Sequence, residues 1–189
     1  MDVIQLINQV QNCTKCGLCK SRTNAVFGEG SFEAEIMFIG EGPGKAEDLQ
    51  GKPFVGAAGK LLTKLIESIG LTREQVFIAN VVKCRPPKNR DPLPAEVKAC
   101  WPYLEAQIRL IKPKLIVTLG RHSMGRFLPG LKISEVHGSS EIASGIWQER
   151  QVYLPLYHPA VALYDPRKRD TLFEDFAQIP LILKKLDDA

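Results

Sequence analysis

The sequence has no apolar run that approaches the ~20 residues needed for a membrane-spanning helix. Its first residues, Met1 to Ile7, have neither a basic start nor a long apolar centre, so we expect no secretory signal peptide. Charge of one sign is not in great excess either, because the formal net charge is +4. Such a charge permits a polyanionic partner without requiring one, so the position of the basic residues matters more than their number.

The composition predicts a cytoplasmic globular protein with no membrane segment. With 189 residues, of which 44% are hydrophobic, the chain is long enough to bury a substantial core, and we assign residues 1–189 to a single domain. It contains five cysteines. In a reducing compartment, thiols bind metal or take part in chemistry more often than they form structural disulfides.

A glycine-rich loop follows the first predicted strand. Residues 35–39 contain a short apolar run with β-branched and aromatic members, which is typical of a strand buried on both faces. The run leads into Gly40-Glu41-Gly42-Pro43-Gly44, where the glycines leave backbone N–H groups open to a flat ligand. We expect this loop to be the floor of an active-site pocket, with Glu41 as its one ionisable side chain. The alternative is a plain tight turn.

The loop matches neither common nucleotide-binding motif. A Walker loop needs a glycine where Ile39 stands, and Ser or Thr where Ala46 follows Lys45. The dinucleotide fingerprint fails because Lys45 occupies the position of the third glycine. Both types of nucleotide-binding loop are therefore excluded.

Strands and helices alternate along the rest of the chain. Further strands are expected at 76–82, 115–119 and 152–156, and helices at 61–69, 95–111, 121–128 and 170–186, while 129–150 has no clear period and suggests at most a hairpin. This alternation predicts a parallel sheet with helices on both faces. Right-handed crossovers place the carboxyl ends of parallel strands on one edge, so the glycine loop, Asn80 and His158 should converge at one crevice.

The cysteines predict a metal centre. Cys13 and Cys16 have the spacing of two thiolates on one centre, and Cys84 and Cys100 bracket a loop further along the chain. Four such thiolates can hold Zn²⁺ or an iron–sulfur cluster, and spacing alone does not separate the two. Cys19 competes for the fourth position, because it extends the first pair to a ferredoxin-like spacing. We expect the centre to be structural and to join the N-terminal segment to the sheet edge.

Several motifs occur together in one order. They are the cysteines, Gly40–Gly44, Gly51-Lys-Pro-Phe54-Val-Gly56, Asn80-Val-Val-Lys-Cys84-Arg-Pro-Pro87 and His158-Pro-Ala160. Over roughly residues 10–185 they closely resemble the family 4 uracil-DNA glycosylases. The resemblance implies a three-layer αβα fold with a central four-stranded parallel sheet, and release of uracil from DNA with an abasic site left behind. It also implies a 4Fe–4S cluster on Cys13, Cys16, Cys84 and Cys100, with Cys19 spare.

The resemblance also implies a uracil pocket. Its residues would be Gly40, Glu41, Gly42, Glu47, Phe54, Asn80 and His158. After the nucleotide is flipped out of the duplex, Phe54 would stack on the base and Asn80 would accept from N3–H and donate to O4, a pattern that cytosine reverses. His158 would donate to O2, where negative charge develops as the bond breaks. The alternatives are a core aromatic at Phe54 and a capping role for Asn80.

The water nucleophile has a weaker assignment. In the best-known branch of the superfamily, an aspartate at the position of Gly42 activates the water. Glu41 is the nearest residue that could replace this aspartate, and Asn89 would help to position the water. We expect Glu47 to close the side of the pocket that excludes the methyl group of thymine. His122 and His137 are expected to be structural.

DNA contacts are expected from two basic runs that flank the crevice. One is Lys83, Arg85, Lys88 and Arg90, and the other is Arg167, Lys168 and Arg169. Leu163 would fill the gap that the flipped nucleotide leaves. The expected partner of this monomer is uracil-containing DNA, single- or double-stranded.

Two other functions compete with this one. A relative that bonds covalently to DNA would carry a glutamine in the glycine motif and a histidine in the basic loop, whereas this chain has Glu41 and no histidine there. The other is a DNA-binding module that is stabilised by metal and releases no base.

Overall fold

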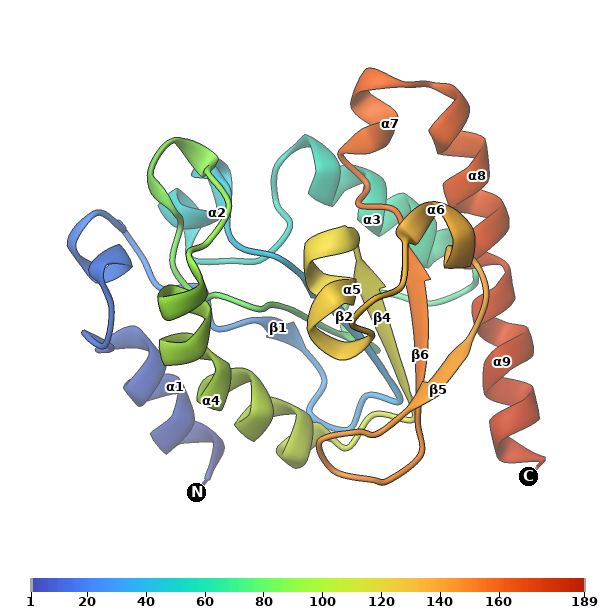
Figure 1. Cartoon of the computed structure of the whole chain (residues 1–189), viewed down its shortest axis with the longest axis horizontal. Coiled ribbons are helices and arrows are strands. Elements are labelled where there is room, and N and C mark those ends of the chain that lie inside the picture. Colours follow the sequence, from blue (N-terminus) through green and yellow to red (C-terminus); the bar gives the residue numbers. More distant parts are fainter. Residues whose placement is uncertain (1, 189) are drawn as a thin grey trace.

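A six-stranded sheet runs through the middle of the computed structural model, which describes residues 2–188 (Figure 1). Its strands are β1 (Glu29–Gly30), β2 (Ile36–Gly40), β3 (Phe77–Asn80), β4 (Leu115–Leu119), β5 (Glu141–Ala143) and β6 (Gln151–Leu156). They lie in the order β1-β3-β2-β4-β6-β5. The four inner strands are parallel, and β1 and β5 pair antiparallel at the two edges.

The predicted four-stranded sheet matches this parallel core but is wrong about the edges. The inner strands are buried along their whole length, and their continuous apolar runs were visible in the sequence. In contrast, β1 has two residues next to Gly28, and β5 is partly exposed. Short, half-exposed edge strands leave no buried apolar run, so no pattern indicated them.

Helices cover both faces of the sheet and make the α/β fold a three-layer one (Figure 1). One face is covered by α1 (Val3–Gln11), α4 (Pro94–Ile111) and α5 (Arg121–Phe127), and the other by α3 (Ala57–Ser68), α8 (Arg167–Phe176) and α9 (Gln178–Asp187). Successive side chains of β2 alternate between the two cores, with Met37 and Ile39 on the first face and Ile36 and Phe38 on the second.

Short helices complete the chain. They are α2 (Lys45–Gln50), α6 (Ile133–Val136), α7 (Val161–Tyr164) and the 3₁₀ turns η1 (Gly17–Lys20) and η2 (Pro87–Asn89). The single closing helix predicted at 170–186 is in fact two helices, because Pro180 has no N–H to donate to the carbonyl of Phe176. Within residues 2–188, no helix has both the length and the apolarity to cross a membrane.

Phe176 attaches the last two helices to the sheet. Its ring stacks on that of Phe38 with centroids 5.6 Å apart and an angle of 7° between the planes. Both side chains are fully buried. We expect Phe176→Ala to lower the free energy of unfolding by about 3–5 kcal/mol, measured by urea denaturation, because removal of a fully buried ring leaves a cavity in the core.

The control is Leu181→Ala on α9, since Leu181 is 55% exposed and its loss should change stability by only about 0.5 kcal/mol. Equal losses in the two variants would contradict this account.

Candidate active site

A pocket of about 470 Å³ opens where β2, β3 and β6 end, at the edge of the sheet drawn uppermost in Figure 1. Its floor is Glu41–Gly44, and its walls include Phe54, Asn80 and His158. The structure therefore brings together three side chains that the sequence places far apart. Pairing of β2 with β3 sets Gly40 directly opposite Asn80.

Asn80 presents an unused acceptor. The residue is 2% exposed, and its side-chain Oδ1 is buried and has no hydrogen-bond partner within the described part of the chain. A Cβ on Gly40 would lie 2.5 Å from this oxygen and 2.6 Å from Cζ of Phe54. Only glycine at position 40 therefore leaves room for both the Asn80 and the Phe54 side chains. A buried acceptor left unpaired is costly, so this oxygen is set to receive a hydrogen bond from a ligand.

Phe54 is held in a strained backbone conformation. Its φ is +50°, in the left-handed region that residues with a Cβ rarely adopt. Arg73 donates to the carbonyl oxygens of Phe54 (3.2 Å) and Pro53 (2.7 Å). Oε1 of Glu47 accepts from the next two backbone N–H groups, both at 2.9 Å. Strain that is clamped from two sides is typical of functional positions.

Glu47 thus has a structural task that the sequence did not reveal. It lines the pocket as predicted, but one carboxylate oxygen is committed to the loop that carries Phe54. Arg73, which the sequence analysis missed, shares this task. Exclusion of the thymine methyl group by Glu47 stays a prediction.

His158 is a neutral hydrogen-bond donor at the pocket wall. Its ring stacks against Phe54 with centroids 5.5 Å apart. Burial lowers the pKa of His158 to about 4, against a smaller opposing effect of the Glu47 carboxylate, so the imidazole is uncharged at pH 7. Because Nδ1 accepts from the backbone N–H of Ala160 at 3.1 Å, the ring proton resides on Nε2.

Glu41 has charged neighbours that the sequence analysis did not connect with it. Burial raises the pKa of Glu41, while His122, Arg121 and Arg126 act in the opposite direction. One ligand atom each of Glu41, Asp91 and His122 lie within 4.8 Å of one another. His122, expected to be merely structural, is thus part of the surroundings of Glu41. The position of His122 just after the end of β4 could have indicated that it lies near the pocket.

The residues of the basic loop before α4 lie in different surroundings. Asn89 lines the pocket, and its Oδ1 accepts from Nε of Arg85 at 2.7 Å. Arg90 also lines the pocket, but it makes two hydrogen bonds to Glu96, at 2.7 and 2.9 Å, that compensate its charge. Lys88 is exposed. Arg85, Lys88 and Arg90 thus lie on the flank where DNA contacts were predicted.

The prediction that Lys83 contacts DNA is wrong. Lys83 is 1% exposed, and its Nζ donates to the backbone oxygen of Asn80 at 2.9 Å and to Oε1 of Gln107. Burial lowers the pKa of Lys83 to about 8, which still leaves an ammonium group at pH 7. A side chain enclosed in this way cannot reach a phosphate.

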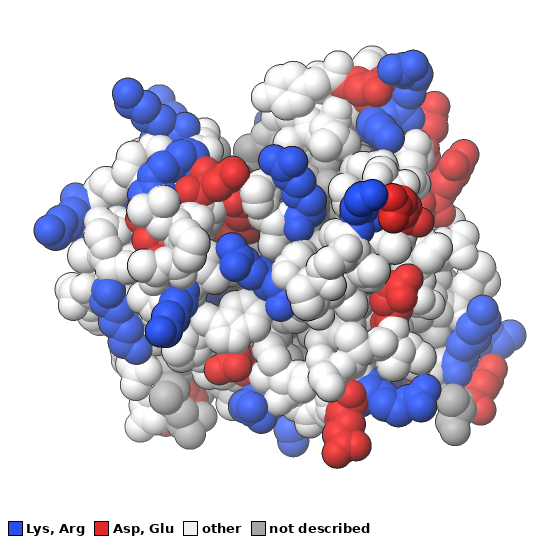
Figure 2. Space-filling view, viewed as in Figure 1, with Lys and Arg blue, Asp and Glu red and all other residues white. Residues whose placement is uncertain are grey.

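The second basic run lies across the pocket from the first. Arg167 and Arg169 are exposed at the start of α8, and Nζ of Lys168 lies 4.2 Å from the centre of the Tyr157 ring. Leu163 lines the pocket and is 50% exposed. Figure 2 shows basic side chains on both upper flanks of the molecule, with a recess between them.

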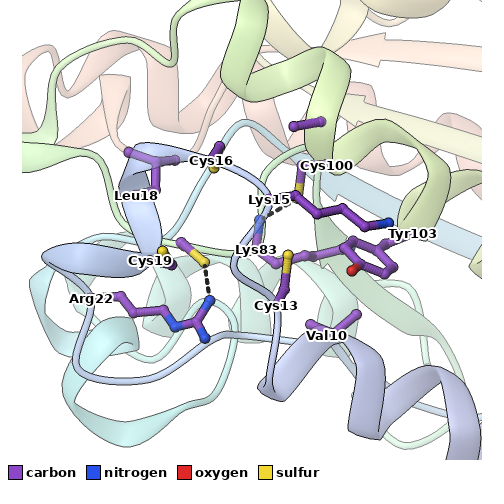
Figure 3. Close-up of a pocket in the computed structure, with 12 residues that line it drawn as sticks. Val10, Cys13, Lys15, Cys16, Leu18, Cys19, Arg22, Lys83, Cys100 and Tyr103 are labelled. Atoms are coloured by element: carbon purple, nitrogen blue, oxygen red, sulfur yellow. Dashed lines mark hydrogen bonds between the residues drawn. The ribbon is translucent and has the colours of Figure 1, made fainter.

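The cysteines gather in a second pocket, beside α1 and α4 (Figure 3). Cys13 and Cys16 follow α1, Cys84 follows β3 and Cys100 lies on α4, with Cys19 nearby on η1. Nη1 of Arg22 donates to Sγ of Cys84 at 3.1 Å, and the backbone N–H of Lys83 donates to Sγ of Cys100 at 3.2 Å. Such N–H donors stabilise thiolates that bind a metal centre.

The thiols of Cys13, Cys16, Cys84 and Cys100 form what we call the cysteine cage. Four thiolates are a donor set that suits a tetrahedral zinc ion or an iron–sulfur cluster.

Comparison with known proteins gives one consistent set of matches. The family model described as "Uracil DNA glycosylase superfamily" matches residues 27–179. A type-4 uracil-DNA glycosylase of Sulfurisphaera tokodaii is 53% identical over 95% of this chain and 84% of its own length. Proteins of the same name from Saccharolobus solfataricus (52% identical, 95% and 86% covered) and Thermotoga maritima (41%, 97% and 96%) are similar over comparable spans.

The buried neutral state of His158 predicts a pH dependence of stability. The pKa of His158 falls from 6.5 to about 4 on folding, so between these pH values the unfolded chain binds more protons. The neutral, buried imidazole of His158 contributes its full stability to the fold above pH 6.5, and this contribution is lost as the pH falls toward 4. Urea unfolding at pH 7 and 4.5 should therefore show a smaller loss of stability for His158→Gln than for the wild type. The same loss in both proteins would mean that His158 is protonated in the folded state.

Proposed function

The chain belongs to the uracil-DNA glycosylase superfamily, and on that premise we propose that it hydrolyses the N-glycosidic bond of uracil in DNA. The products are free uracil and an abasic site. The observation that carries this proposal is the buried, unpaired Oδ1 of Asn80 at the wall of the pocket.

Asn80 supplies the selectivity for uracil. Its Oδ1 accepts the N3–H of uracil, and its amide NH₂ donates to O4. Cytosine has an acceptor at N3 and a donor at N4, so both hydrogen bonds would fail. Leaving two buried polar groups unpaired costs about 1–3 kcal/mol each, which is ample for discrimination.

Phe54 and His158 hold the base and take up its charge. The ring of Phe54, fixed by Arg73 and Glu47, provides the surface on which the flipped base stacks. The Nε2–H of neutral His158 donates to O2 of uracil, and backbone N–H groups of the Gly40–Gly44 loop assist. Because these donors are in place before the reaction, they stabilise the uracil anion as the bond breaks.

Glu41 and Asn89 are proposed to position the attacking water. Both line the pocket, and Oε1 of Glu41 is buried without a hydrogen-bond partner in the described chain. Burial and the nearby Asp91 raise the pKa of Glu41, which makes its carboxylate a better proton acceptor for water, while His122 and two arginines oppose this rise.

DNA lies across the mouth of the pocket in this proposal. Phosphates contact Arg85, Lys88 and Arg90 on one flank and the basic start of α8 on the other. Leu163, half exposed at the rim, fills the space left by the flipped nucleotide. We propose that the protein acts on this DNA as a monomer. We also propose a cytoplasmic location, where DNA is accessible and cysteines stay reduced.

The cysteine cage is proposed to hold a 4Fe–4S cluster. Cys13, Cys16, Cys84 and Cys100 are its ligands, and Cys19 is not required. The all-thiolate donor set and the N–H donors of Arg22 and Lys83 support this assignment. The cluster contributes structure and no step of the reaction is routed through it.

The function is tested with a uracil-containing oligonucleotide, followed by alkali to cleave at abasic sites. The wild type should produce strand cleavage, and Asn80→Asp should gain activity on cytosine, because a protonated carboxyl group can donate to N3 of cytosine. Asn8→Asp, an exposed amide change on α1, is the matched control and should behave as wild type. Binding of uracil-containing DNA without release of free uracil would refute the enzyme and leave a DNA-binding module.

The cluster is tested by absorption and metal analysis of purified protein. We expect a band at about 400 nm and bound iron, both lost in Cys100→Ala. Cys19→Ala is the matched control and should retain both. Stoichiometric zinc without iron would overturn the assignment.

A further inference from the structure

Lys83 lies buried between the pocket and the cysteine cage. Lysine is almost never fully buried without partners, because removal of its charge from water is costly. Here the ammonium group has two acceptors, the backbone oxygen of Asn80 and the side-chain oxygen of Gln107. Neither the reaction nor DNA binding, as described above, uses this side chain. Its burial therefore needs an explanation of its own.

Within residues 2–188, no strand of the sheet donates a hydrogen bond to the backbone oxygen of Asn80. The N–H of Val81 donates to the oxygen of Gly40 in β2, so the carbonyl of Asn80 points the opposite way, toward β1. However, β1 reaches only as far along β3 as Ile78. Nζ of Lys83 takes the place of the missing strand and satisfies this oxygen.

Lys83 is also connected to the helix that bears a cluster ligand. Gln107, fully buried on α4, accepts from Lys83 and donates to the backbone oxygen of Phe27 at 2.7 Å. On the same helix, two turns earlier, Cys100 accepts from the backbone N–H of Lys83, as the dashed line in Figure 3 shows. One residue thus joins the end of β3 to the thiol-bearing helix.

We propose that Lys83 is a positioning residue that fixes the main chain of Asn80, and with it the amide that reads uracil, to the helix carrying Cys100. The inference rests on the proposed function, because Asn80 reads the base only if the pocket binds uracil. Lys83 touches neither substrate nor DNA and acts through Asn80. A small shift of the amide weakens its hydrogen bonds to the base, and misplacement by about 1 Å can cost up to 10²-fold in rate.

The test compares the wild type with Lys83→Met, which keeps the length of the side chain and removes the ammonium group. The single-turnover rate of uracil excision should fall about tenfold or more, and the inhibition constant for free uracil should rise in parallel. Affinity for a uracil-free oligonucleotide should stay within about twofold, because Lys83 is enclosed. The iron–sulfur absorption band reports whether the cage is intact.

Gln151→Met is the matched control for general destabilisation. Gln151 is equally buried and donates to the backbone oxygens of Pro113 and Lys114, at the opposite end of the sheet. This variant should keep the wild-type inhibition constant for uracil. If Lys83→Met does not fold, Gln107→Met removes the same connection from the other side and should shift the rate and the inhibition constant in the same direction.

The outcomes separate the two proposals. A wild type that releases no uracil refutes the function itself. An active wild type with an unchanged rate and uracil inhibition constant in Lys83→Met refutes the positioning role and leaves the function standing. Weaker binding of uracil-free DNA with unchanged inhibition by uracil would also refute it, because that is the behaviour of a phosphate contact.

Discussion

The parallel pairing of β2 with β3 is the constraint on which the pocket depends. Its register sets Gly40 opposite Asn80, and the absent side chain of Gly40 leaves the space in which the Asn80 amide and the Phe54 ring meet. A slip of one residue would turn Asn80 to the other face of the sheet. The position of the Asn80 amide is thus set by backbone hydrogen bonds between the two strands.

Preorganisation of the pocket follows from how few of its groups are free to move. Phe54 is held by Arg73 and Glu47, and the tautomer of His158 is fixed by the backbone N–H of Ala160. Within the described chain, Oδ1 of Asn80 and Oε1 of Glu41 are buried in the pocket without a hydrogen-bond partner, and in the proposed function uracil and water fill these places. Binding energy is then not consumed in arranging the site.

The inner strands and the convergence of Asn80 and His158 at one edge could be predicted from the sequence, because buried parallel strands leave continuous apolar runs and their carboxyl ends share an edge. The edge strands left no such run. Lys83 was misjudged because a lysine among other basic residues is normally exposed, and its acceptors come from Asn80 and from a distant helix. His122 was missed because its neighbour Asp91 lies in a loop whose path no local pattern determines.

The cysteine cage belongs to one side of the molecule. Cys84 and Cys100 lie in the core formed with α1, α4 and α5, and Cys13 and Cys16 pack against it, whereas the core under α3, α8 and α9 contains no cysteine. Loss of the cage would therefore loosen one layer and leave the packing of the other in place. If the proposed cluster is lost, amide exchange and protease sensitivity should therefore rise first in the cysteine-bearing layer.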